Sequence, residues 1–339
     1  MIARIGPDRL LRLAAIAFVV GCAAIVALDY GWLLDPTTIG GDVSNYYAAG
    51  QRLNAGHALY GLQAGDRPVP LNPPYWTVPL LSPPPIAVLW RPLAALGDTS
   101  MFLWWWAAAI VGIASVAWLI ATGSARRQWL IVLLSPGVAL LCLAGNVNAF
   151  LLPVLATAWW ASRESRHGVA GASIALASAL KVTPAVFGWW LLVRREWAPA
   201  AWSIAWGLAI LGLSLLGAGL DAHLRYLSIA GETSSSGVSR LSLVGIATSA
   251  GLPPDFAPLI TPLVAVTGLV AIWLLRRRPA ASFAAAAVVS VIVSPVIYFE
   301  QISLLVLAGV PFGSLRRAPA ERPSNTGEGT SSAGVADPG

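Results

Sequence analysis

The sequence is short of charged residues. Asp, Glu, Lys and Arg make up 11% of its 339 residues, whereas a soluble domain carries about 25% because its surface faces water. Hydrophobic residues make up 57%, the mean hydropathy is +0.72, and the apolar residues fall in long blocks. An apolar helix of about 20 residues crosses a bilayer. We therefore expect an all-α polytopic integral membrane protein.

Lysine is almost absent, because Lys181 is the only one among 21 basic residues. The net charge of +6 comes from arginines that follow apolar blocks in pairs or triplets, which is typical of cytoplasmic loops and argues against nucleic acid as a partner. With both termini cytoplasmic, every such group lies inside: Arg126-Arg127, Arg194-Arg195, Arg276–Arg278 and Arg316-Arg317.

Motifs of soluble enzymes are missing. Cys22 and Cys142 lie 120 residues apart in apolar runs, and His57, His167 and His223 do not approach the spacing of metal ligands. No GxxxxGK[ST], GxGxxG or GxSxG pattern occurs. We expect no metal and no cofactor.

The apolar blocks predict about ten transmembrane or half-membrane helices within a membrane domain of residues 1–317. Several are only 12–16 residues long, too short to cross fully. Residues 80–97 contain Pro83-Pro84-Pro85 and Arg91-Pro92, which predict a juxtamembrane or re-entrant segment. Residues 318–339 predict a disordered cytoplasmic tail. The predicted helices are Leu13–Asp29, Phe102–Thr122, Trp129–Leu143, Val147–Trp160, Val169–Leu180, Val182–Val193, Trp197–Leu216, Pro258–Leu275, Phe283–Ile297 and Ile302–Leu315.

This topology gathers several polar segments on the extracytoplasmic side. They include a long loop at residues 30–79, with a short surface helix expected at Ala48–Leu59, and a polar loop at Asp221–Asp255, with a short helix expected within Leu241–Ala250. The turns at Gly145 and Lys181 and the segment 298–300 lie on the same side.

Five of these polar residues have two readings each. Asp42 can be either a general base that accepts a proton from a hydroxyl or the N-cap residue of a helix. Lys181 costs about 2.5–3.5 kcal/mol at mid-membrane, so it either meets a lipid phosphate or extends to the interface. Asn146 and Asn148 bind ligand or satisfy turn backbone. Glu300 either contributes to the same site or has a structural capping role. Tyr47 is a further candidate for binding the donor. Tyr298, Glu300 and Arg240 are candidates for contacts with the acceptor or the donor.

Five short motifs occur in a fixed order over residues 40–310. They are Gly41-Asp42 with Tyr47, Ala48-Ala49, Leu53, Gly56 and Tyr60; Ser82–Leu89 with Pro92-Leu93-Ala94; Gly145–Asn148; Ala170-Gly171 through Ala179–Pro184; and Ser294–Tyr298. Together they resemble glycosyltransferase family 87, which contains polyprenol-phosphate-mannose-dependent alpha-mannosyltransferases of actinobacteria with the GT-C membrane fold. The chain departs from the family in having Phe299-Glu300-Gln301 where histidine is frequent, and it is short for the family.

The resemblance implies a multi-pass hexosyltransferase of the plasma membrane with an extracytoplasmic active site. It would move a sugar, with mannose expected, from a polyprenyl-phosphate donor to an envelope glycolipid or glycan. Asp42 would deprotonate the acceptor in a single inverting displacement, and Lys181 would offset charge on the departing phosphate.

Two other classes of function use similar chains. A transporter or lipid flippase also has many helices and midplane charges, but such proteins often contain repeated halves, and no repeat is evident here. A non-catalytic partner in envelope assembly would keep the fold without the chemistry, and loss of Asp42 would then leave envelope glycans unchanged.

Overall fold

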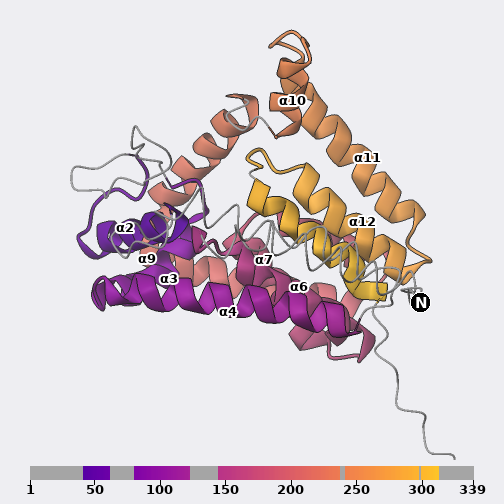
Figure 1. Cartoon of the computed structure of the whole chain (residues 1–339), viewed down its shortest axis with the longest axis horizontal. Coiled ribbons are helices and arrows are strands. Elements are labelled where there is room, and N and C mark those ends of the chain that lie inside the picture. Colours follow the sequence, from indigo (N-terminus) through magenta and orange to yellow (C-terminus); the bar gives the residue numbers. More distant parts are fainter. Residues whose placement is uncertain (1–40, 62–79, 123–143, 237–240, 298, 313–339) are drawn as a thin grey trace, which may run out of the picture.

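The computed structural model describes residues 41–61, 80–122, 144–236, 241–297 and 299–312, and within these ranges there are helices and no strands (Figure 1). The predicted helices Leu13–Asp29 and Trp129–Leu143 and the predicted tail at 318–339 lie outside the described residues. The α-helices are α2 (Gly41–Asn54), α3 (Pro84–Ala95), α4 (Thr99–Thr122), α6 (Asn148–Arg163), α7 (His167–Leu180), α8 (Val186–Val193), α9 (Trp197–Ser236), α10 (Leu243–Ser249), α11 (Ile260–Leu274) and α12 (Pro279–Ile292). The 3₁₀-helices are η3 (Thr183–Ala185), η4 (Ala257–Leu259) and η5 (Phe299–Phe312).

The core lies where α6, α7, α8 and α12 meet, around large side chains that are fully buried. Trp190 packs against Phe283, and Phe283 in turn contacts Phe187 and Trp159. Small residues let α7 approach α9 closely, since a Cβ at Gly171 would come within 2.5 Å of the Trp202 Cβ. This is the usual way in which helices pack inside a membrane protein.

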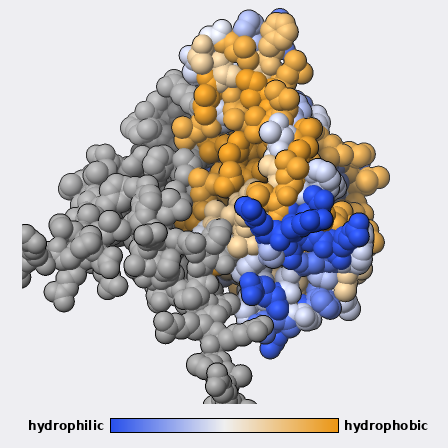
Figure 2. Space-filling view, turned by 90° about the vertical axis from the view of Figure 1, so that its right-hand side faces the viewer, coloured by the Kyte–Doolittle hydropathy of each residue, from blue (hydrophilic) through white to orange (hydrophobic). Residues whose placement is uncertain are grey.

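Within the part of the chain that the structure describes, two helices are long and apolar enough to cross a membrane, Trp197–Thr233 in α9 and Ala257–Leu274 in η4 and α11. Only 6% and 11% of their apolar windows are buried, whereas a core helix of a soluble protein would be mostly buried. Their exposed side chains include Leu208, Leu213 and Leu263. Figure 2 shows a broad hydrophobic surface that ends at a hydrophilic band. These faces fit lipid as their solvent, as expected of an all-α membrane protein.

The prediction of a loop at Asp221–Asp255 is wrong over its first part. The α9 helix continues to Ser236 across a break at Gly219, whose φ of 80° lies in the left-handed region that glycine tolerates. Beyond the break, Ala222, Tyr226 and Ile229 pack against the core at helical spacing. The polar residues that suggested a loop lie on the exposed face of this helix. The short helix expected within Leu241–Ala250 is α10.

The helix expected at Ala48–Leu59 begins earlier, at Gly41, and much of it is buried rather than on the surface. It ends where Gly56 adopts a φ of 73°, and the backbone of His57 bonds back to the Arg52 carbonyl at 2.9 Å. Close packing holds α2 against α3, because a Cβ at Gly50 would lie 2.5 Å from the Trp90 carbonyl oxygen.

Two further segments differ in form from expectation. Pro83, Pro84 and Pro85 do not break a helix but begin α3, because proline is tolerated in the first turn. The predicted helix Ile302–Leu315 is described as the 3₁₀-helix η5. At about 2.0 Å per residue, its 14 residues extend farther than an α-helix of that length.

Candidate functional site

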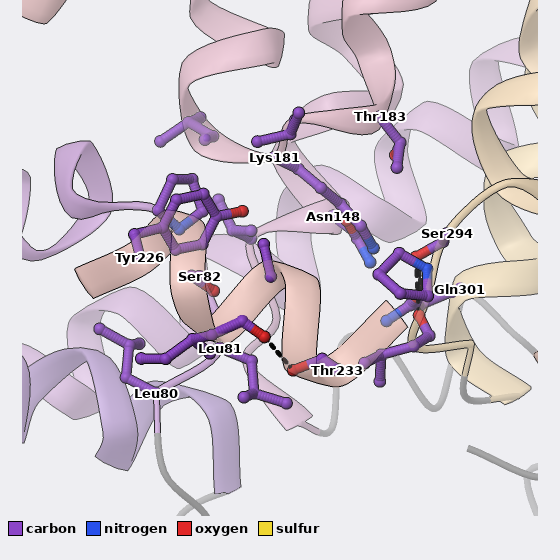
Figure 3. Close-up of a pocket in the computed structure, with 18 of the residues that line it drawn as sticks. Leu80, Leu81, Ser82, Asn148, Lys181, Thr183, Tyr226, Thr233, Ser294 and Gln301 are labelled. Atoms are coloured by element: carbon purple, nitrogen blue, oxygen red, sulfur yellow. Dashed lines mark hydrogen bonds between the residues drawn. The ribbon is translucent and has the colours of Figure 1, made fainter. Parts of the chain in front are cut away.

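A cavity of about 400 Å³ lies where α2, residues 80–83 before α3, the N-terminus of α6, the turn between α7 and η3, the part of α9 after Gly219, residues 293–296 and Gln301 meet (Figure 3). Its wall combines apolar side chains, such as Leu80, Leu81 and Val293, with a set of polar ones. The polar lining residues are Asp42, Asn45, Ser82, Asn146, Asn148, Lys181, Thr183, Thr233, Ser294 and Gln301.

The Asp42 carboxylate is held by an amide from a distant part of the chain. Asn146 Nδ2 donates to Asp42 Oδ2 at 2.6 Å, and Asn146 Oδ1 accepts from the Asn148 backbone N–H at 2.8 Å. The second bond fixes the amide so that its NH₂ group faces Asp42. Asp42 lies inside the first turn of α2 rather than at the N-cap position, and this hydrogen bond joins it to another helix. The carboxylate is thus oriented through one of its oxygens while its residue lines the cavity.

Electrostatic surroundings make Asp42 more basic than an ordinary aspartate. Burial raises the pKa of its carboxyl, and the hydrogen bond from Asn146 and the positive charge of Lys181 offset part of that increase. A general base works best when its pKa approaches the operating pH. The site therefore contains a carboxylate whose basicity is set by burial and tuned by two named neighbours.

Lys181 lies at the C-terminus of α7, where the chain becomes extended with φ −151° and ψ 131°. Its backbone N–H bonds to the Ala177 carbonyl at 3.0 Å, so the residue closes the helix as well as lining the cavity. A cation in this position is favoured by the helix dipole. The cavity thus contains a carboxylate and an ammonium group on different elements, which can serve opposite charges of one reaction.

The side of the cavity formed by residues 293–296 and Gln301 is organised by Ser294. Its hydroxyl donates to the Val296 carbonyl at 2.7 Å and lies 3.5 Å from Gln301 Oε1. These contacts bring Ser294, which follows α12, and Gln301, which lies in η5, to the cavity, and both side chains line it.

Half of the eight site residues predicted from sequence are brought together. Asp42, Asn146, Asn148 and Lys181 line the same cavity. Tyr47 is buried outside the cavity, with its ring edge-on to Trp90 at 6.4 Å, and the neighbouring Tyr46 lines the cavity instead. Tyr298, Arg240 and the Glu300 side chain lie outside the described residues, although Glu300 precedes the lining residue Gln301.

Sequence reasoning missed Thr183, Tyr226, Thr233 and Gln301 as lining residues. Thr183 follows Lys181 by two positions and Gln301 follows Glu300, so proximity to a candidate was the only signal for either. Tyr226 and Thr233 lie in the part of α9 that was expected to be a loop.

A second cavity of about 480 Å³ adjoins the first and is mainly apolar. Residues of α7 and α9 form most of its wall, and Pro83, Tyr226 and Leu227 line both cavities. Tyr226 stacks on Tyr60, whose hydroxyl donates to the Ser82 carbonyl at 2.8 Å. Burial raises the pKa of Tyr60, and the neighbouring Tyr226 adds to the increase, so this phenol stays protonated as a donor.

Within the described residues, no group of three or more His, Cys, Asp or Glu side chains is arranged to hold a metal ion. The absence of a cofactor stays a prediction.

Comparison with known proteins identifies similar chains. The model of glycosyltransferase family 87 matches residues 81–295, which include Asn146, Asn148, Lys181 and Ser294 and begin after Asp42. A polyprenol-phosphate-mannose-dependent alpha-(1-2)-phosphatidylinositol pentamannoside mannosyltransferase of Mycolicibacterium smegmatis is 28% identical over 282 residues, covering 78% of this chain and 65% of the relative.

The protein of the same name from Mycobacterium tuberculosis is 26% identical, over 78% of this chain and 63% of the relative. The chain therefore spans somewhat less than two thirds of the length of these curated relatives. No solved structure matches it significantly.

Proposed function

The chain belongs to glycosyltransferase family 87, and from this membership we propose that it is a membrane hexosyltransferase that transfers mannose from a polyprenyl phosphate to an extracytoplasmic envelope acceptor. The observation that carries the proposal is the cavity in which Asn146 holds the Asp42 carboxylate while Lys181 supplies a cation. Both relatives are named as polyprenol-phosphate-mannose-dependent enzymes, which is the class of donor proposed here.

The proposed reaction is a single displacement at the anomeric carbon. Asp42 accepts the proton of an acceptor hydroxyl as its oxygen attacks the sugar C1. The bond between C1 and the phosphate oxygen breaks, and polyprenyl phosphate leaves with the electron pair. One displacement inverts the configuration at C1. The proton on Asp42 then passes to solvent, which restores the carboxylate for the next turnover.

Lys181 has the complementary role in this scheme. Negative charge accumulates on the phosphate as the C1–O bond breaks, and a preorganised cation beside it lowers the energy of that transition state. The position of Lys181 at a rigid helix end suits this role, because little reorganisation is then needed during the reaction.

The second cavity supports a lipid-linked donor. Its wall is largely apolar, and it meets the polar cavity at Pro83, Tyr226 and Leu227. A prenyl chain lying there would place its phosphate at the boundary between the two cavities, on the side where Lys181 lies. Burial of apolar surface would provide most of the affinity for such a chain.

The extracytoplasmic side is supported by the distribution of charge along the helices. The α6 helix begins at the cavity and ends at Arg163, whereas α7 begins after Arg166 and ends at the cavity. Likewise α8 leads from the cavity to Arg194, and α12 leads from Arg278 to the cavity. Since arginine-rich ends favour the cytoplasm, the cavity would face the other side.

The proposal is tested by reconstituting the full-length protein in vesicles with labelled polyprenyl-phosphate-mannose and an envelope glycolipid extract. We expect labelled mannose to appear on the glycolipid. Movement of the intact donor lipid between leaflets without transfer of the sugar would indicate a flippase and contradict the proposal.

A further inference from the structure

Unpartnered polar atoms are concentrated at one place in the protein. Among the described residues, four buried side-chain atoms have no hydrogen-bond partner: Trp90 Nε1, Asn148 Oδ1, Asn148 Nδ2 and Thr183 Oγ1. Three of the four belong to Asn148 and Thr183, which line the polar cavity. Buried polar groups are nearly always paired, so their clustering at a cavity points to a ligand that pairs them.

These two residues flank the proposed reacting groups. Asn148 is 1% exposed, and its backbone N–H fixes Asn146, the residue that holds Asp42. Thr183 lies two positions after Lys181, at the start of η3. In Figure 3 the Asn148 amide is seen between Lys181 and the pair formed by Ser294 and Gln301. A ligand that contacts Asn148 and Thr183 therefore lies in the same cavity as the carboxylate and the cation.

The kind of atoms left unpaired identifies the kind of ligand. An amide offers two N–H donors and a carbonyl acceptor, and a threonine hydroxyl both donates and accepts. A phosphate supplies acceptors only, so it would leave Asn148 Oδ1 unpaired. Hydroxyl groups both donate and accept, and neighbouring hydroxyls on a sugar ring can satisfy both ends of the amide together with the threonine.

We infer that Asn148 and Thr183 bind hydroxyls of the hexose carried by the donor and thereby select the sugar. The inference rests on the proposed function and adds its specificity-determining residues. The donor sugar is favoured over the acceptor because Thr183 adjoins Lys181, where the phosphate linked to that sugar would lie. Hydroxyls of the acceptor share this chemistry and are distinguished by experiment.

The first test measures binding without turnover, as the rise in unfolding temperature of the full-length protein in detergent. We expect polyprenyl-phosphate-mannose to stabilise wild type more than polyprenyl phosphate does. Asn148→Leu and Thr183→Val should abolish that difference while keeping the shift caused by polyprenyl phosphate. Without ligand, both variants should unfold at or above the wild-type temperature, because unpaired buried polar groups are replaced by apolar ones of similar shape. A lower unfolding temperature, with the sugar-dependent shift intact, would make both residues structural and overturn the inference.

The second test compares transfer from mannose donors and from donors lacking one hydroxyl at a time. A site built to bond a hydroxyl rejects the analogue lacking it by about 10⁴-fold, and we expect wild type to reject at least one deoxy donor on that scale. Thr183→Val and Asn148→Leu should each lower kcat/KM for mannose, while leaving kcat/KM unchanged for the donor that lacks the hydroxyl bound by the replaced side chain. Ser290→Ala, which removes a buried hydroxyl bonded to the Ala287 carbonyl away from the cavity, should preserve the discrimination.

Two outcomes of this comparison would overturn the inference. Equal losses for mannose and every deoxy donor would assign the residues a role in folding. Loss of discrimination among deoxy acceptors, with donor discrimination intact, would assign the hydroxyls to the acceptor. Failure of the proposed function is distinguishable, because wild type would then transfer no mannose while the binding test still reports on the donor sugar.

Discussion

Replacing Asn146 tests how the protein tunes its candidate base. The hydrogen bond from Asn146 Nδ2 to Asp42 Oδ2, at 2.6 Å, stabilises the ionised carboxylate against the effect of burial. A bond to a charged group contributes about 1.5–3 kcal/mol, which is about a 10- to 150-fold change in a protonation equilibrium. Asn146→Ala should therefore raise the pKa of Asp42 further above its ordinary value.

The sign of the kinetic effect follows from the role of the base. Asp42 must be ionised to accept a proton, so transfer falls as the pH drops through its pKa. In Asn146→Ala this acidic limb of kcat/KM should move to higher pH, and the rate on the limb should fall by about 10- to 150-fold. At high pH, where the carboxylate is ionised in both proteins, much of the rate should return.

The assay is transfer of labelled mannose measured from pH 5 to pH 9, a range of about four pH units chosen around the operating range of a carboxylate base. Asn45→Ala is the matched control, because Asn45 lines the same cavity while the bond to Asp42 comes from Asn146. Asn146→Asp separates charge from structure, since it keeps the oxygen that accepts from the Asn148 N–H and adds a like charge beside Asp42. It should move the limb farther than Ala does. An acidic limb that stays in place in both variants would refute the coupling.

Three other predictions use different parts of the molecule. Lys181→Ala should weaken donor use severely and Lys181→Arg should keep part of it, because charge persists although the planar guanidinium differs from an ammonium; equal kinetics for all three proteins would reduce Lys181 to a structural residue. In a cysteine-free background, Ser228→Cys should react with an impermeant thiol reagent on intact cells and Glu164→Cys only after permeabilisation, and the reverse pattern would invert the proposed orientation. Gly171→Ala should lower stability by about 1–3 kcal/mol through overpacking, measured by thermal unfolding in detergent, while Gly188→Ala, with nothing within 4 Å of its Cβ, should not; equal effects would contradict the close packing of α7 on α9.

Much of the candidate site was predictable because apolar blocks constrain where polar residues can lie. Once α6, α7 and α8 are recognised as antiparallel segments, the turns between them must alternate between two ends, with arginines at one end. Asn146 and Lys181 are then placed together at the other end without knowledge of any contact. The order of the short motifs added Asp42 to the same set.

The register of α2 shows where this reasoning stopped. The helix within the loop at residues 30–79 was expected only from Ala48, whereas α2 already includes Gly41 and Asp42. At about 100° per residue, Tyr46 follows Asp42 on one face of α2, whereas Tyr47 is rotated by about 140° from Asp42. That rotation explains why Tyr46 lines the cavity and Tyr47 packs against Trp90.

The part of α9 after Gly219 was missed for a different reason. Its polar residues were read as solvent-facing loop, although one face of an amphipathic helix has the same composition. For Thr183 the sequence offered only its proximity to Lys181, because an unpaired hydroxyl can be recognised only after the residues that bury it are known.

The most direct test of the account is mannosyl transfer by Asp42→Asn in reconstituted vesicles, at membrane levels matched to wild type. Asparagine keeps the size of the side chain and removes the base, and loss of a positioned general base costs about 10²–10⁴ in rate. Asp221→Asn, an exposed position on α9, is the control and should transfer normally. We expect Asp42→Asn to fold, to bind the donor and to transfer at most about one hundredth as fast as wild type. Transfer above about one tenth of the wild-type rate would contradict the assignment of Asp42 as the base.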